Sequence, residues 1–407
     1  MNPVIPAPVP VPLPAPAWLV QALLVFTFIL HLLLMNLLVG GGVMLALSSY
    51  LGRRDPRHRD LARRVVRVMP PVVAFTITMG VAPLLFLQLL YGQFFYTSSV
   101  LIAWVWLAVV LLLVVAYYGI YWFNFQQEAL GRRAFWVMLA TALILVRIMM
   151  TYNQNMSFLE RPQDFYPRFL ETPVGNYLGS FDAGTMARFA HFLTAALAVG
   201  GLGLALLARA WREEAPELAT WARRYGVKWF MAGTGIEFLV GLWFLFSLPA
   251  EIRNPFLGAD KLATAILVAA IVLAVLAMVA APRSLAAGAV AIVGTISLMA
   301  VIRHLVRIAR LRPYFDPHAL PVQGQCGWCS PSSLYFCWLV LPPWAGCSTG
   351  SSALFRPARL QLSSSQPAAR SPVAHSWPLT LRPFLAFSAS ANLWGHPDSP
   401  RSMRRAG

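Results

Sequence analysis

Long apolar runs alternate with short polar connections along most of the chain. A helix needs about 20 residues to cross the hydrocarbon core of a bilayer, and eight of the runs reach that length. Leu, Ala and Val fill these runs without strict alternation, which favours helices over a membrane barrel. The pattern predicts an all-α, polytopic transmembrane helical bundle of about eight spans, at residues 18–47, 70–91, 100–123, 134–152, 186–208, 228–248, 262–280 and 285–308.

Composition and charge support this membrane assignment. The chain is 58% hydrophobic and only 12% charged, which leaves too little polar surface for a soluble protein of this size. The connections on one side hold fifteen Lys and Arg residues, and those on the other side hold four. By the positive-inside rule, we expect the basic side in the cytoplasm, the N-terminus outside and a bacterial inner (cytoplasmic) membrane location. Anionic lipid beside the basic loops then accounts for the net charge of +17 without nucleic acid.

Four arginines do not fit this charge asymmetry. They lie at or after the end of the eighth span, on the predicted outer side, and two explanations remain open. Either this segment lies at the membrane interface, or the number of spans is wrong by one. The four residues are Arg303, Arg307, Arg310 and Arg312.

The sequence divides into three regions. Residues 1–17 form a proline-rich segment that we expect on the outer face as a polyproline lead-in. Residues 18–312 form the bundle, and residues 313–407 an irregular or disordered tail. All four cysteines fall within 326–407, which has one acid, Asp398, and no helical or strand period. We interpret 326–407 as out-of-frame translation or a disordered extension, and its Cys-x-x-Cys pair lacks the following His of a c-type haem site.

Histidines inside two of the spans are the main functional candidates. His31 lies in the first span and His191 near the start of the fifth. An ionisable side chain inside a membrane is costly and usually faces a cavity, a cofactor or a partner. Because neutral imidazole is a common ligand of haem iron, we predict that both are axial ligands of one or two b-type haems. His304, at the end of the eighth span, is a further candidate, unless it lies at the membrane interface.

Four other polar residues complete the candidate site. Arg188 lies one helical turn before His191 and on the same helix face, where it balances a propionate or a quinone oxygen or snorkels to the interface. Arg147 and Glu237 either pair with each other, or Arg147 holds a haem propionate while Glu237 conducts protons. Gln88 is a quinone or proton candidate, or it forms an interhelical hydrogen bond.

Several local patterns, in order along the chain, carry a resemblance to a known family. They are 28–33 around His31 followed by Leu38-Val39-Gly40, 74–98 with Gln88, 149–162 with Asn153-Gln154-Asn155, and Arg188-Phe189-Ala190-His191. Together they cover about half of the chain and resemble the first five to six spans of subunit I of the cytochrome bd quinol oxidases. The resemblance implies haem b as the cofactor, a quinol as the substrate and His31 and His191 as haem ligands.

The chain also departs from that family. The span 100–123 contains no acid, where the family has two glutamates beside its oxygen-reducing haems. The connection 249–261 is short, where the family has its long quinol-oxidation loop. These differences argue against oxygen reduction by this chain. Met231 lies in a motif like that of the family's second low-spin haem ligand, but the predicted topology places it away from His191; Met299 and His304 are better placed.

Two functions remain open. In the first, the chain binds haem b, takes part in a quinol-oxidising oxidoreductase complex and passes electrons to a c-type cytochrome partner within a hetero-oligomer. In the second, it is a haem-free membrane anchor or transporter subunit. A transporter typically has an inverted internal repeat, and the sequence shows no convincing repeat.

Overall fold

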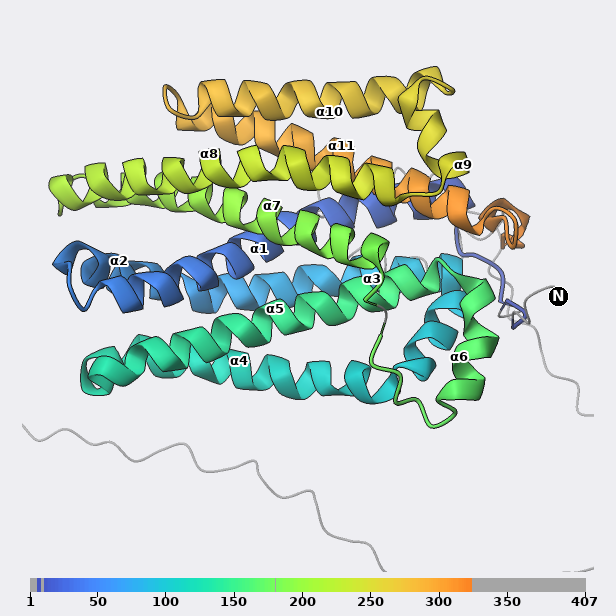
Figure 1. Cartoon of the computed structure of the whole chain (residues 1–407), viewed down its shortest axis with the longest axis horizontal. Helices are drawn as coiled ribbons and strands as arrows, with labels where there is room; N and C mark the ends of the chain where they lie inside the picture. The colour runs from blue at the N-terminus through green and yellow to red at the C-terminus, as the bar shows by residue number, and fades with distance from the viewer. Residues whose placement is uncertain (1–5, 9–10, 180, 324–407) are drawn as a thin grey trace, which may run out of the picture. The chain divides into compact units, whose positions relative to one another are not determined.

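Long helices packed side by side make up nearly all of the described chain (Figure 1). The computed structural model describes residues 6–8, 11–179 and 181–323, all within one unit, Met1–Val340. The long helices are α1 (Ala17–Leu51), α3 (Met69–Leu101), α4 (Ala103–Leu130), α5 (Ala134–Leu159), α7 (Ala183–Leu207), α8 (Pro216–Ser247), α10 (Lys261–Ala280) and α11 (Leu285–Leu311). Three shorter helices join them: α2 (Pro56–Val66), α6 (Phe165–Glu171) and α9 (Ala250–Arg253).

The helices confirm the predicted polytopic bundle. Seven helical stretches of the described residues are long and apolar enough to cross a membrane. The longest stretch, Ala103–Leu159, contains both α4 and α5, which turn back on each other around the three-residue segment Gly131–Arg133 (Figure 1). The described chain therefore has eight membrane-length helices, in agreement with the eight predicted spans.

Polar N-caps fix where several helices begin. Asp55, Asp182, Asp260 and Ser284 each accept a backbone N–H from the first turn of α2, α7, α10 and α11 respectively. These contacts satisfy donors that have no partner within the helix. Burial alone would raise the pKa of Asp182, but hydrogen bonds from Thr185 and the charge of Arg161 lower it below its usual value of 3.8.

Two predicted outer connections are partly wrong, because helices continue through them. α3 runs on to Leu101 beyond a kink at Tyr91, and α5 runs on to Leu159. The residues 153–155 look like a loop in the sequence, yet they are buried within the bundle. Asn153 Nδ2 donates to the Thr185 carbonyl (3.0 Å), and Asn155 Nδ2 donates to Ser99 Oγ (3.0 Å). Internal partners of this kind let polar side chains remain in a buried helix.

Helix α1 lies at the centre and contacts α3, α5, α7 and α11. Glycines permit its close approach to α7. A Cβ on Gly40 would lie 2.0 Å from the carbonyl oxygen of Ala196, so only glycine fits at this position. The structure places a helix against Gly40.

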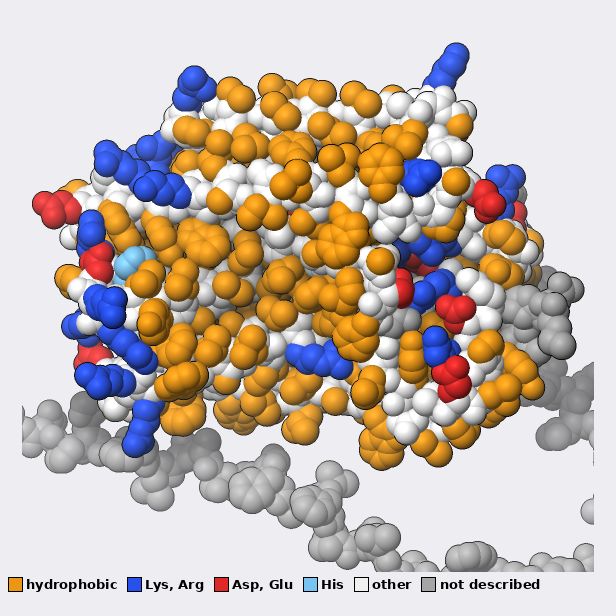
Figure 2. Space-filling model, in the orientation of Figure 1, with side chains coloured by type: hydrophobic (Ala, Val, Ile, Leu, Met, Phe, Trp, Pro, Cys, Tyr) orange, Lys and Arg blue, Asp and Glu red, His pale blue; other side chains and the backbone are white. Residues whose placement is uncertain are grey.

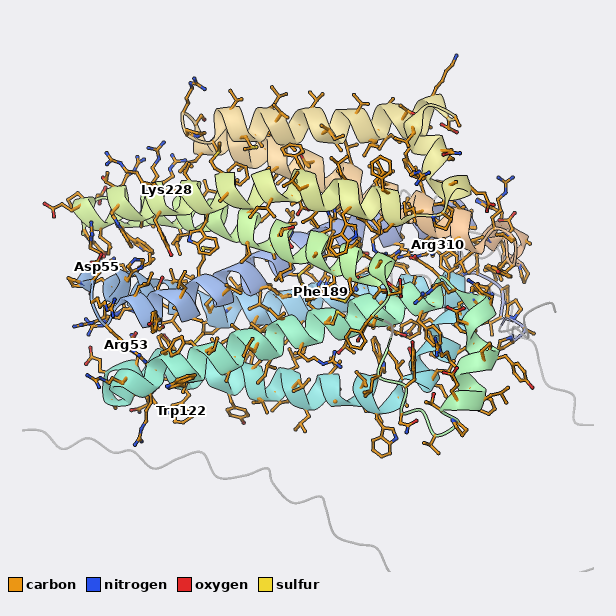
Figure 3. All side chains as sticks on the ribbon, in the orientation of Figure 1. Arg53, Asp55, Trp122, Phe189, Lys228 and Arg310 are labelled. Atoms are coloured by element: carbon orange, nitrogen blue, oxygen red, sulfur yellow. The ribbon has the colours of Figure 1, made fainter. Side chains whose placement is uncertain are left out.

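Side chains on the bundle surface form an apolar belt between two charged ends. Figure 2 shows hydrophobic side chains across the middle of the visible face and Lys and Arg side chains gathered at one end. Figure 3 places Arg53, Asp55 and Lys228 at that end and Arg310 toward the other. The basic end contains α2 and the turns α4–α5 and α7–α8, which are the connections that the sequence analysis assigned to one side.

The two ends of the described chain meet at the end opposite the basic one. Leu13 and Val322 form a parallel bridge, in which the Leu13 amide donates to Pro321 (2.7 Å) and the Gln323 amide donates to Leu13 (2.9 Å). The N-terminal segment is therefore paired with the chain that follows α11, rather than being only a polyproline lead-in. The region 326–407, interpreted above as out-of-frame or disordered, lies outside the described residues.

Candidate functional site

A cavity of about 310 Å³ lies inside the bundle among α1, α3, α4, α5, α7 and α11. Most of its wall consists of Leu, Val, Ile, Met and Phe side chains, which suits a largely apolar ligand. A few polar side chains interrupt this wall: His31, Thr76, Tyr152, Asn153, Arg303, His304 and Arg307.

His31 has a fixed orientation at this cavity. Its Nδ1 lies 3.1 Å from the carbonyl oxygen of Thr76 on α3. A carbonyl at this position favours the proton on Nδ1 and leaves the Nε2 lone pair available to a metal, as in many metal-ligating histidines. The ring fits because residue 80 is glycine: a Cβ there would lie 2.9 Å from His31 Cε1.

Helix α11 supplies a cationic wall to the same cavity. Arg303 and Arg307 lie one turn apart, and His304 is next to the first of them. The Arg303 guanidinium lies over the Phe28 ring, 5.0 Å from its centroid, and that of Arg307 lies 5.9 Å from the Tyr91 centroid. The Nε atoms of both arginines are buried without a hydrogen-bond partner in the described chain. The wall thus offers N–H donors to an anionic group.

Glu160, directly after α5, is the acid that these arginines surround. Its side chain is 1% exposed, and one oxygen lies 2.5 Å from Arg188 Nη2. Nε of Arg310 lies 3.7 Å from Glu160, and Nε of Arg307 lies 3.9 Å from it. Burial alone would raise the pKa of the Glu160 carboxyl, but the charges of Arg188, Arg303, Arg310 and Arg307 lower it from 4.5 to about 2.

The arginines outnumber the acid in this cluster. Four guanidinium groups act on one carboxylate, so positive charge remains in a poorly solvated region. Such charge is costly unless an anion offsets it. The part of the cluster that faces the cavity, Arg303 and Arg307, is therefore suited to the carboxylate substituents of a bound ligand.

This cluster also explains the arginines that did not fit the charge asymmetry. The span count of eight stands, and α11 continues to Leu311. Arg303, Arg307 and Arg310 belong to this helix and approach Glu160 inside the bundle. The cluster accounts for Arg303, Arg307 and Arg310, whereas Arg312, directly after α11, is exposed. An interfacial position of this segment stays a prediction.

His191 lies apart from the cavity, between α7 and α8. Its Nδ1 is 2.8 Å from Glu237 Oε1, and the hydroxyl of Thr194 donates to the other oxygen of Glu237. Its ring lies stacked 5.9 Å from that of Phe244. As at His31, an acceptor beside Nδ1 leaves Nε2 for a metal. The structure thus places His31 and His304 at one site and His191 with Glu237 at another.

Three other candidates have different surroundings from those expected. Arg147 donates from Nη1 to Thr151 Oγ1 (2.8 Å), and within the described chain Glu237 pairs with His191 instead of Arg147. Gln88 accepts a hydrogen bond from the Tyr96 hydroxyl (3.4 Å) and does not line the cavity. The Arg188 side chain does not extend to the surface of the bundle, because it is 5% exposed and bonded to Glu160.

The methionine candidates stay unsupported as ligands. Gly201 of α7 packs against Trp229 and Phe230 of α8, so the neighbouring Met231 lies about ten residues along α7 from His191. At 1.5 Å per residue this separation is roughly 15 Å. Met299 is absent from the cavity wall, where its neighbour Ala300 is found.

Three residues of the site were missed in the sequence. Thr76 acts through its backbone carbonyl and Gly80 through its lack of a side chain, and neither leaves a signal in a single sequence. Glu160 was counted within an outer loop. Its place directly beyond the fourth span, at the same predicted membrane level as the unexplained arginines after the eighth span, was the signal that could have identified it.

The fold and cavity define a polytopic helical membrane protein with a largely apolar cavity that is lined in part by histidine and arginine side chains. No family model matches the sequence, and no curated protein matches it. Among solved structures, the chain is similar to a chain of the bd oxidase from Geobacillus thermodenitrificans, with a TM-score of 0.59 and 17% identity. The match covers 80% of this chain and 94% of that chain. This likeness confirms a bd-oxidase-like fold, and the finer resemblance to subunit I stays a prediction from local motifs.

Proposed function

We propose that this chain is a membrane-embedded, haem b-binding electron-transfer subunit that takes part in quinol oxidation. The observation that carries the proposal is a cavity with two features. His31 has its Nδ1 against a carbonyl, and Arg303 and Arg307 keep buried Nε–H groups that have no hydrogen-bond partner in the described chain. The bd-oxidase-like fold supports it, since the solved neighbour is a bd oxidase.

The residues present fit a haem. His31 and His304 would ligate the iron at the cavity, and the apolar wall would hold the macrocycle. Arg303 and Arg307 would pair with the propionates, with Glu160 and Arg188 completing the charge balance. His191 would ligate a second haem, with its ring oriented by Glu237. Bound haem supplies one-electron redox chemistry, while the protein supplies ligands, orientation and electrostatics.

The same proposal includes proton exchange, quinone binding, an electron acceptor and a membrane location. Glu237, hydrogen-bonded by Thr194, would exchange protons as quinol is oxidised, and Gln88 would bind a quinone oxygen. Electrons would pass to a c-type cytochrome partner within a hetero-oligomer. The chain would lie in the bacterial inner membrane with its N-terminus outside. Oxygen reduction by this chain is not part of the proposal, because the span 100–123 has no acid.

The decisive experiment is a reduced-minus-oxidised absorption spectrum of the purified full chain. We expect a Soret band and b-type α bands. His31→Ala and His304→Ala should remove or shift one component, and His191→Ala a different one. His318→Ala, at an exposed position outside the bundle interior, is the matched control and should leave the spectrum unchanged.

A chain purified without Soret absorption, even after haem supplementation, would eliminate this function and favour a haem-free anchor or transporter subunit. Unchanged spectra in all three variants would overturn the ligand assignment while leaving haem binding intact.

A further inference from the structure

A second cavity, of about 260 Å³, lies at the basic end, away from the histidine cavity. It is formed where the turn after α7, the first part of α8 and the α10–α11 turn meet. Four arginines and the first turn of α11 line it: Arg209, Arg212, Arg223, Arg283 and residues 284–286.

These four arginines form no ion pair with an acid among the residues that the structure describes. Elsewhere at the basic end, Arg57 pairs with Asp55, Arg63 with Asp60 and Glu128, and Arg64 with Glu214. Within the described chain no carboxylate lies within 4.0 Å of the four cavity arginines, whose charges therefore add up without compensation.

Two of the guanidinium groups are held in place by backbone carbonyls. Arg223 Nη2 donates to Pro282 (2.8 Å), and Arg283 Nη1 donates to Val279 (3.0 Å). A guanidinium has five N–H donors in a fixed fork, so each group keeps further donors for an anion. Converging guanidinium forks match the geometry of phosphate oxygens.

The cavity adjoins an exposed apolar surface. Leu276 and Val279 near the end of α10 are 51% and 54% exposed, and Val290 near the start of α11 is 74% exposed. Arginine side chains lie next to this apolar surface at the basic end (Figure 2). A ligand that combines a phosphate with hydrocarbon chains can contact the arginines through its phosphate and the apolar surface through its chains.

We propose that this cavity binds the phosphate of an anionic phospholipid, whose acyl chains lie along the exposed faces of α10 and α11. Basic pockets between membrane helices are suited to such head groups. The site is independent of haem binding, because it shares no residue with the histidine cavity.

The test is a lipid titration of the purified full chain in a zwitterionic detergent, read out by native mass spectrometry and by the unfolding midpoint. The probes are phosphatidylglycerol, phosphatidylcholine and inorganic phosphate. The double variant Arg212→Gln/Arg283→Gln removes two cavity charges. The matched control Arg132→Gln/Arg133→Gln removes two charges from the α4–α5 turn, at the same end but outside the cavity.

We expect phosphatidylglycerol to bind the wild type and raise its midpoint, with phosphatidylcholine much weaker. The cavity variant should bind about 10- to 30-fold more weakly, because each cationic contact contributes roughly a factor of five. The control variant should keep its affinity. The midpoint without lipid and the elution profile verify that each variant folds, and Arg209→Gln offers a milder second variant.

Equal losses in the two double variants would mean attraction to the basic end in general and would overturn the site. Unchanged binding in the cavity variants would also overturn it. Stabilisation by inorganic phosphate that matches phosphatidylglycerol would overturn the lipid assignment and identify a soluble phosphoryl ligand.

Discussion

The orientation of His31 depends on two neighbours that carry no charge. The Thr76 carbonyl lies 3.1 Å from Nδ1, and the missing side chain of Gly80 makes room for the ring. A ligand histidine needs one nitrogen fixed and the other exposed to its metal. Both neighbours belong to α3, so this helix sets the geometry of a ligand on α1.

Gly80→Ala tests that dependence. The new methyl group would lie 2.9 Å from His31 Cε1 and 3.0 Å from Nδ1, and the ring would have to move. We expect an altered haem spectrum and a loss of stability of about 1–3 kcal/mol from overpacking. Absorption spectra and denaturant unfolding measure the two effects.

Gly235→Ala is the matched control, because a Cβ there would meet nothing within 4 Å. A helical Gly→Ala change in open space should stabilise by up to about 1 kcal/mol. An unaltered spectrum in Gly80→Ala would show that the ring position is not set by this contact.

Glu160→Gln tests the buried ion cluster. The neutral amide would leave the surrounding guanidinium groups without their carboxylate, and we expect a loss of about 3–5 kcal/mol at pH 7. The pKa of Glu160 is lowered from 4.5 to about 2, so its carboxylate contributes stability that is fully present above pH 4.5. That contribution is lost as the pH falls from 4.5 toward 2.

The difference in unfolding midpoint between wild type and Glu160→Gln should therefore stay constant from pH 5 to 8 and shrink below pH 4.5. A difference that varies between pH 6 and 8 would contradict the lowered pKa. Thermal unfolding of both proteins in detergent at fixed ionic strength measures this difference in midpoint.

Sequence reasoning selected the histidines as candidates because polar residues inside apolar runs stand out, and their ligand role stays a prediction. His31, His191 and His304 all lie within the bundle, at positions where a ligand role is possible. Their partners could not be predicted, since a pair such as His191 and Glu237 depends on the register between two helices. A single sequence carries no record of that register.

Among the helix pairs, α7 and α8 show how register is fixed. A Cβ on Gly201 would lie 2.6 Å from Trp229 Cβ and 2.7 Å from the Gly226 carbonyl oxygen. Small residues let these helices approach closely, and the same contact sets the level at which His191 meets Glu237.

Gly201→Ala should therefore disturb both packing and the distant pair. Backbone atoms cannot move aside as a flexible side chain can, so we expect a loss of about 1–3 kcal/mol. We also expect a change in the spectral component assigned to His191 and none in that of His31. Unfolding and difference spectra of Gly201→Ala beside Gly235→Ala provide the measurement, and an equal effect of both substitutions would contradict the packing argument.

Helix starts were predicted well where a polar N-cap precedes the apolar run, as at Asp260 and Ser284. They were wrong where a buried helix contained polar residues, as at Asn153 and Asn155. Mean hydropathy averages over the side chains of a segment. It does not report the internal partners that allow an amide to remain in a helix.

Taken as a whole, the molecule has its uncompensated arginines at one end and its Glu160 cluster toward the other. The spans and this asymmetry follow directly from composition, so the sequence could predict them. The asymmetry also predicts the orientation of the bundle in the membrane.

Cysteine labelling measures that orientation. In a background with all four native cysteines replaced by serine, Ala129→Cys near the α4–α5 turn and Ala259→Cys between α9 and α10 introduce one exposed thiol each. We expect a membrane-impermeant thiol reagent to label Ala259→Cys in spheroplasts, and Ala129→Cys only after the membrane is opened. The reverse pattern would invert the topology, with the helices unchanged.

The pairing of Leu13 with Pro321 and Gln323 joins the segment before α1 to the segment after α11. During synthesis, the segment before α1 can pair only after α11 has been inserted. This segment is therefore made early but reaches its native contacts late. Residues 13 and 322 therefore lie close enough for a short linker to join them. A circular permutant opened at the α4–α5 turn would thus keep every helix contact of the original order.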